Sequence, residues 1–240
     1  MAEPALVSLL LIALCAGLAM PAGALLGCYE RVFPAWLDEE LRHGILAMGA
    51  GALMSAVALV LVPEGIHAVS IPAASISFLA GSLAFMWADI WLAKHQFSAS
   101  QLVSMLIDFI PESVALGTAA AIGSGSLLLG VLVAVQNFPE GFNAYRELKD
   151  QGHFSNRRII GLFTLMAFSG PLMALMGFYW LADYPAVVSC IMLFAAGGIL
   201  YSLLQDIAPQ VKMDNHWAPP LGGVLGFMIG LLGYMLERGG

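Results

Sequence analysis

The segment Gln136-Asn137-Phe138-Pro139-Glu140-Gly141 places an amide and a carboxylate four residues apart in the middle of a long apolar run. A related segment, Asp108-Phe109-Ile110-Pro111-Glu112-Ser113, has the same spacing, again with a proline directly before the glutamate. In a helix, residues i and i+4 lie on one face about 6 Å apart. Each segment therefore predicts a pair of oxygen-bearing side chains that point in the same direction.

Acidic side chains inside apolar helices are costly unless something neutralises them. An ionised acid at the centre of a bilayer costs roughly 2.5 to 3.5 kcal/mol, so Asp108, Glu112 and Glu140 together would cost on the order of 8 to 10 kcal/mol. We expect no basic partner, because the nine Lys and Arg residues fall in predicted connections, at the end of a span or after the last span. The proline in each segment frees a backbone carbonyl one turn earlier, which adds an oxygen acceptor. The pattern predicts a metal or proton site.

The composition places this chain in a membrane. Of its 240 residues, 60% are hydrophobic and 10% are charged, whereas soluble domains average about 45 to 50% apolar and 25% charged residues. The net charge of −7, with only nine Lys and Arg residues, excludes nucleic-acid binding as a class. The three cysteines have no paired spacing and predict no disulfide framework. We expect an all-α, polytopic integral membrane protein in a single transmembrane domain, residues 1–240.

A membrane span needs about 20 apolar residues, and the chain accommodates eight of them. The predicted spans are 5–28, 43–67, 72–93, 99–121, 125–146, 159–182, 186–205 and 218–236. The first is interpreted as a retained helix, because it is longer than the apolar part of a signal peptide and Glu3 replaces the usual positive charge before it.

Basic residues predict the orientation of the spans, since Lys and Arg beside short connections stay in the cytoplasm. Arg238 alone falls on the opposite side from the others, which are Arg31, Arg42, Lys94, Arg146, Lys149, Arg157, Arg158 and Lys212. With eight spans, this distribution places both termini outside.

Polar residues on the fourth and fifth spans recur at steps of three and four, the spacing of one helix face. They are Gln101, Ser104, Asp108 and Glu112 on the fourth span, and Gln136, Glu140, Asn143 and Glu147 on the fifth. The outer half of the fourth span, 114–122, is nearly all apolar or small, and the outer half of the fifth span, 127–135, is apolar. The two stripes predict a polar pathway that is open towards the cytoplasm and closed towards the exterior.

A third proline-glutamate pair, Pro63-Glu64, ends the second span, and His67 follows one turn later. The predicted orientation places Glu64 and His67 near the outer surface. They either receive a cation from the exterior or belong to a helix end that lies among the lipid headgroups.

These motifs resemble the ZIP family of divalent metal transporters, in its bacterial type. In that family the fourth and fifth of eight helices carry a mid-membrane metal site, each with a ligand, often His, followed by Asn or a similar residue, one further position and Pro-Glu-Gly. Residues 136–141 match this pattern well, with Gln136 as the first ligand, and residues 108–113 keep its spacing and its Pro-Glu pair. The resemblance implies transport of Zn, Mn, Fe or Cd ions towards the cytoplasm, a homodimer and, for a bacterial member, the inner membrane.

The departures from the family pattern change the expected site. Phe109 stands where the family has Asn, and the Ser169-Gly170-Pro171 stretch lacks the family's glutamate. We therefore expect one metal, the transported substrate rather than a cofactor, held by Asp108, Glu112, Gln136 and Glu140. Asn137, Glu64 and His67 are accessory candidates. Met54 is another, because a methionine on the second helix completes the site in some members, although packing is an alternative role.

The ligand types favour particular ions and leave other functions open. Carboxylate and amide oxygens suit harder ions such as Mn²⁺ better than they suit zinc. An intramembrane metalloenzyme would use the same carboxylates to activate water, but the sequence has no HExxH or Gly-x-Ser-x-Gly motif, and we expect no enzyme. A proton-coupled carrier of organic solutes, in which the acids relay protons, is the other alternative.

Overall fold

A computed structural model describes residues 2–29, 35–95, 100–123, 126–152, 154–181, 183–211 and 217–239. All regular structure within these ranges is helical, and they contain no strand. Arg31 and Lys212, which supported the predicted orientation, and the span-end residues 99, 125 and 182 lie outside them. The described part does not include the side chains of Gln101, Ser104 and Arg238.

The described helices form eight rods, each of which is a single helix or a run of consecutive helical segments. Five rods are single helices: α1 (Ala2–Tyr29), α4 (Ile71–His95), α5 (Ser100–Ile122), α6 (Ser126–Asp150) and α11 (Pro219–Gly239). Three rods contain a π-helical turn: α2 (Ala35–Ala56), η2 (Val57–Leu61) and α3 (Val62–Gly65); α7 (Asn156–Ala167), α8 (Ser169–Met176) and η3 (Gly177–Leu181); and α9 (Pro185–Ser202), η4 (Leu203–Ile207) and α10 (Ala208–Val211). Each predicted span coincides with one rod.

Seven of the eight rods are long and apolar enough to cross a membrane, as expected of an integral membrane protein. The rod outside that set is α6, which has 25 residues and matches the other rods in length. It is more polar, because it carries Gln136, Asn137 and Glu140 and ends in a charged segment. A helix that holds a polar site in its middle is expected to look less like a lipid-facing span.

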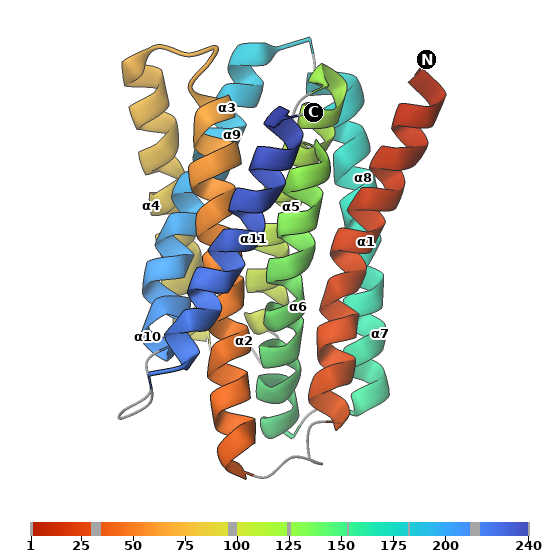
Figure 1. Ribbon diagram of the computed structural model, residues 1–240, viewed down its shortest axis with the longest axis vertical. Helices are drawn as coiled ribbons and strands as arrows, with labels where there is room; N and C mark the ends of the chain where they lie inside the picture. The colour runs from red at the N-terminus through yellow and green to blue at the C-terminus, as the bar shows by residue number, and fades with distance from the viewer. Residues whose placement is uncertain are drawn as a thin grey trace.

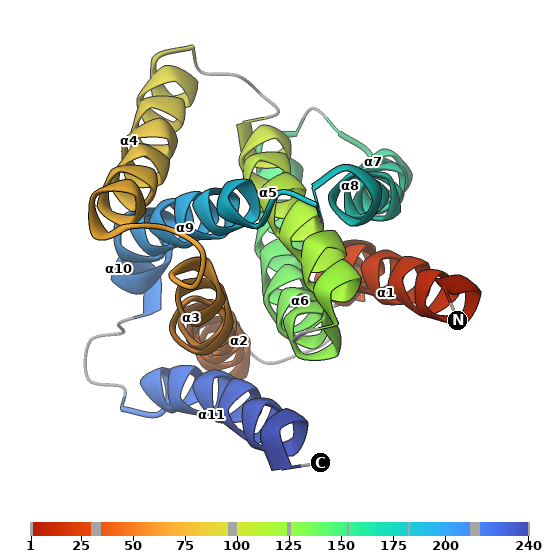
Figure 2. The same ribbon diagram turned by 90° about the horizontal axis from the view of Figure 1, so that it is seen from above.

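The rods run alternately up and down, and both chain ends lie at the same end of the bundle (Figure 1). Seen from above, α5 and α6 lie between two groups of helices, with α1, α7 and α8 on one side and α2, α3, α4, α9, α10 and α11 on the other (Figure 2). Helix α1 packs along α6, α11 along α2 and α4 along α9. The two helices that carry the proline-glutamate motifs are therefore surrounded by protein.

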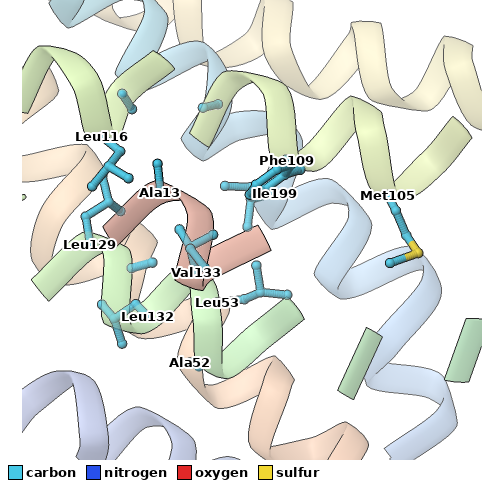
Figure 3. Close-up of a cluster of buried hydrophobic side chains, with 14 of the residues drawn as sticks. Ala13, Ala52, Leu53, Met105, Phe109, Leu116, Leu129, Leu132, Val133 and Ile199 are labelled. Carbon is cyan, nitrogen blue, oxygen red and sulfur yellow. The ribbon is translucent and has the colours of Figure 1, made fainter. Parts of the chain in front are cut away.

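The buried core joins the two groups of helices. Its labelled side chains come from α1, α2, α5, α6 and α9 (Figure 3): Ala13, Ala52, Leu53, Met105, Phe109, Leu116, Leu129, Leu132, Val133 and Ile199. Glycines let the backbones approach closely, as is common between membrane helices. A methyl group added at Gly141 would overlap the carbonyl oxygen of Met20, and one at Gly23 would overlap that of Phe138. Helices α1 and α6 thus contact each other backbone to backbone beside the Pro-Glu-Gly motif.

Candidate functional site

Glu112 on α5 and Gln136 on α6 form a buried polar pair. Glu112 is 1% exposed and Gln136 is fully buried, and the Nε2 of Gln136 donates a hydrogen bond to the Oε1 of Glu112. The other oxygen of each side chain, Oε2 of Glu112 and Oε1 of Gln136, is buried and has no hydrogen-bond partner in the described part of the chain. An unmet buried polar group costs about 1 to 3 kcal/mol, so two free oxygens at one place mark a site that can accept a ligand.

Asp108 and Glu140 lie on the wall of a neighbouring cavity of about 610 Å³. The cavity is lined by residues of α2, α5, α6, α9, η4, α10 and the turn after α6: Arg42, Leu46, Met105, Asp108, Glu140, Asn143, Ala144, Arg146, Glu147, Asp150, Gln151, Ser202, Ile207 and Gln210. Three of the four described positions of the fifth-span stripe are in this lining, and the fourth, Gln136, lies behind it. The stripe therefore faces a cavity, as its spacing predicted.

The other half of the same two helices, away from the cavity, is closed by packing. Val114, Ala115, Leu116 and Ala119 of α5 are buried, as are Leu128, Leu129, Leu132 and Val133 of α6. The buried polar side chain of Thr118 in this half is satisfied within its own helix, because its hydroxyl donates a 2.8 Å hydrogen bond to the carbonyl oxygen of Ala115. The polar cavity and the apolar plug therefore occupy opposite halves of α5 and α6.

The four predicted ligands lie in one region but in two places. Glu112 and Gln136 form the buried pair, and Asp108 and Glu140 lie on the cavity wall. Glu112 is close enough to both Asp108 and Glu140 for their negative charges to act on one another. Among the residues that the structure describes, however, no three His, Cys, Asp or Glu side chains are grouped closely enough to hold a metal ion. An ion bound by all four ligands would require these side chains to move together, including Gln136, whose amide nitrogen now contacts Glu112.

Two arginines share the cavity with the acids, which differs from the expectation that no basic residue accompanies them. Arg42 near the start of α2 and Arg146 near the end of α6 both line it. The guanidinium carbon of Arg146 lies 5.8 Å from the centre of the Phe142 ring. Both residues are close to connections in the sequence, as predicted, and an arginine side chain is long enough to extend along a helix from such a position. Four acidic and two basic residues give the lining a formal charge of −2.

The accessory candidates lie elsewhere. The Nδ2 of Asn137 donates a 2.9 Å hydrogen bond to the carbonyl oxygen of Ala16, so this amide connects α6 to α1. Met54 is 44% exposed and lines an apolar groove between α2, η4, α10 and α11, away from the acidic cavity. The structure places Met54 apart from the four predicted ligands, because its face of α2 points towards α11. It is not a core residue either.

Glu64 and His67 lie far from the other candidates. Glu64 is in α3 and partly buried, and His67 follows α3 and is exposed. Helix α3 and the start of α2 are at opposite ends of the bundle (Figure 1), and the cavity includes Arg42 from the α2 start. The structure therefore separates these two residues from the four predicted ligands.

Phe109 fills the space between α5 and α8. It is 1% exposed, and a Cβ atom built on Gly170 would lie 2.6 Å from its Cζ atom. The large ring on α5 therefore requires a residue without a side chain at position 170 of α8. No polar ligand comes from either position.

Comparisons with known proteins add no relative. No protein-family model matches this chain, and no curated protein does either. The family resemblance accordingly rests on the residues of the two proline-glutamate segments and on the order of the helices.

Sequence reasoning missed part of the cavity wall. Arg42, Ser202 and Gln210 belong to helices whose sequences carry no metal-binding motif, and only the packing of α2, α9 and α10 against α5 and α6 brings them there. The spacing of the fifth span predicts that Asn143 belongs to the polar stripe. The spacing could not show that both polar atoms of its side chain are buried without a hydrogen-bond partner in the described residues.

Proposed function

We propose that this protein transports a divalent transition-metal ion, Zn, Mn, Fe or Cd, across a membrane towards the cytoplasm. The observation that carries the proposal is the buried Glu112–Gln136 pair, in which one oxygen of each side chain lacks a partner in the described chain. Asp108 and Glu140 lie beside it on the wall of a cavity with a formal charge of −2. Free oxygens behind a negatively charged cavity are what a cation needs for binding and release.

The donor set gives a preference among ions. Three carboxylates and one amide supply oxygen only, which suits Mn²⁺ and tolerates Fe²⁺, whereas zinc favours nitrogen and sulfur ligands. The position of the cavity gives a route. It reaches the α2 start and the α6 end, and the opposite half of α5 and α6 is packed with apolar side chains. With α6 counted as a span, the bundle has eight spans and a cavity open at one end, and basic residues at that end favour the cytoplasm.

The test is uptake into vesicles that contain the full-length protein. Mn²⁺, Fe²⁺, Zn²⁺, Cd²⁺, Co²⁺ and Mg²⁺ are offered in parallel, and an Asp108→Ala, Glu140→Ala double variant serves as the control. We expect uptake of at least one transition-metal ion that the double variant loses. A folded wild-type protein that takes up none of these ions would refute the proposal.

A proton-coupled solute carrier is the second candidate, because the cavity has features of a small-molecule site. Its volume of about 610 Å³ lies within the range of roughly 300 to 1,000 Å³ that is usual for ligand pockets. Arg42 and Arg146 could bind an anionic group there while the acids exchange protons. Proton-driven uptake of an organic acid without metal would favour this candidate. No observation favours the metalloenzyme.

A further inference from the structure

No hydrogen bond within the described chain explains why the side-chain amide of Asn143 is buried. Its Oδ1 and Nδ2 atoms are both buried, and neither has a hydrogen-bond partner among the described residues. Folded proteins leave few buried polar atoms in this condition, because each costs about 1 to 3 kcal/mol. Asn137, two turns earlier on the same helix, shows the ordinary alternative, since its amide connects α6 to α1. The amide of Asn143 is left free for a ligand.

The position of Asn143 indicates what that ligand is. It follows Glu140 by three residues and so shares a face of α6 with it, and both residues line the cavity together with Asp108 from α5. Two carboxylates and an amide oxygen from two facing helices are a donor set for hard divalent cations. This group contains only two acids, which agrees with the absence of any grouping of three acidic, His or Cys residues in the described chain.

We propose that Asp108, Glu140 and Asn143 form a second cation-binding position on the cavity wall, one step closer to the cavity mouth than the Glu112–Gln136 pair. The inference rests on the proposed function and deepens it, because it divides the path of the ion into two stations. A cation that leaves the buried pair exchanges the oxygens of Glu112 and Gln136 for that of Asn143 while it keeps Asp108 and Glu140. The formal charge of −2 on the lining favours a cation at this position, although Arg42 and Arg146 share the wall.

Substitutions at Asn143 test this assignment with Mn²⁺ as the probe. The purified full-length protein is compared with Asn143→Ala and Asn143→Asp for equilibrium Mn²⁺ binding, for vesicle uptake and for its thermal unfolding midpoint. We expect Asn143→Ala to lower the uptake rate and the affinity of the weaker Mn²⁺ site by about tenfold. Asn143→Asp should restore both, because it returns an oxygen ligand of nearly the same shape.

Asn156→Ala is the matched control. Asn156 also has a buried, unpartnered amide oxygen, and its Nδ2 donates to the sulfur of Cys28 at 3.1 Å, but it does not line the cavity. This variant should leave Mn²⁺ binding and uptake unchanged. Loss of uptake in Asn156→Ala equal to that in Asn143→Ala, with native unfolding midpoints in both, would overturn the assignment.

A third variant keeps the proposal testable even if Asn143→Ala does not fold. Asn143→Cys, in a background with Cys15, Cys28 and Cys190 replaced by Ala, introduces a thiol at the same place. Added Cd²⁺ should produce thiolate-to-metal charge-transfer absorption and should protect the thiol from alkylation. If a folded variant shows neither the charge-transfer absorption nor the protection from alkylation, the second position is overturned.

The two proposals fail in different ways. A wild-type protein that neither binds nor takes up any divalent ion refutes the transport proposal itself. A wild-type protein that takes up Mn²⁺ while Asn143→Ala does so at the same rate refutes only the second position.

Discussion

Glu112 shows how a single carboxylate can be buried and still remain available for binding. One of its oxygens accepts a hydrogen bond from Gln136, and the other has no hydrogen-bond partner within the described chain. A glutamine at position 136 suits this arrangement, because its amide can donate to Glu112 when no ion is present and present its oxygen after rotation. A carboxylate at that position could not donate, and the two groups would repel each other.

Removing the negative charge of Glu112 tests its role in metal binding separately from its role in folding. Glu112→Gln keeps an acceptor for Gln136 and the shape of the side chain but removes the negative charge. We expect metal uptake to fall by at least about tenfold, while the unfolding midpoint does not fall, because a buried amide avoids the desolvation cost of a buried charge. The exposed Asp183 offers a control, and Asp183→Asn should transport normally. Normal uptake by Glu112→Gln would show that its charge has no part in transport.

A substitution at Met54 distinguishes its observed position from the role as a metal ligand that the family resemblance implies. It lines an apolar groove against α11 and not the acidic cavity, so its sulfur is not expected to touch the ion. Met54→Leu should leave Cd²⁺ and Mn²⁺ uptake within about twofold of the wild-type rates, since Leu and Met have similar volumes. A selective loss of Cd²⁺ uptake, which a soft sulfur ligand would cause, would contradict the observed position.

Helix α6 carries most of the candidate site, and its position depends on α1. Asn137 donates to the carbonyl of Ala16, and Gly141 leaves room for the carbonyl of Met20. These two contacts lie on either side of Pro139, where a proline weakens the backbone hydrogen bonding of a helix. Packing against α1 therefore supports the helix where its own hydrogen-bond ladder is interrupted.

Gly141→Ala tests this support. The added methyl group would overlap the backbone of Met20, so α1 and α6 would have to separate, and we expect a loss of about 1 to 3 kcal/mol in stability together with reduced uptake. Gly161 on α7 provides the comparison, because a methyl group there would have nothing within 4 Å. Gly161→Ala should raise stability slightly, by about 0.5 to 1 kcal/mol, through helix propensity. Thermal unfolding in detergent measures both, and equal effects would contradict the packing argument.

The whole molecule has one polar half and one closed half along α5 and α6. The cavity is lined by α5, α6 and members of only one group of helices in Figure 2, namely α2, α9 and α10, so it lies between the central pair and that group. A movement of α2, α9 and α10 relative to α5 and α6 would change the cavity directly, whereas the apolar contacts of Leu129, Leu132 and their neighbours would have to open for passage to the other side.

Thiol labelling from each side of a sealed vesicle measures this asymmetry. In a cysteine-free background, Asn143→Cys should react with a water-soluble reagent applied from the cytoplasmic side, because position 143 lines the cavity. Leu129→Cys and Val114→Cys should resist labelling from both sides, because these positions are buried in the plug. Equal labelling of all three positions would contradict the closed half, and labelling of position 143 only from the exterior would reverse the predicted orientation.

The sequence alone was enough to predict the eight rods of this protein. Hydropathy, proline and glycine act over one or a few turns, so the predicted spans coincide with the rods, apart from ends such as that of α2, which begins at Ala35 and not near residue 43. The spacing of polar residues along the fifth span is also a local property of the sequence. It predicted that Glu140, Asn143 and Glu147 share one face, and this face lines the cavity.

Only the tertiary structure decided what these side chains meet. Helices packed from distant parts of the chain bring Arg42 and Ser202 to the wall beside Asp108, and the acceptor of Asn137 lies 121 residues away in α1. Periodicity cannot show such partners, because it specifies the direction of a side chain from its own helix and not the neighbour in that direction. For the same reason Met54, on a helix that does line the cavity, proved to face α11.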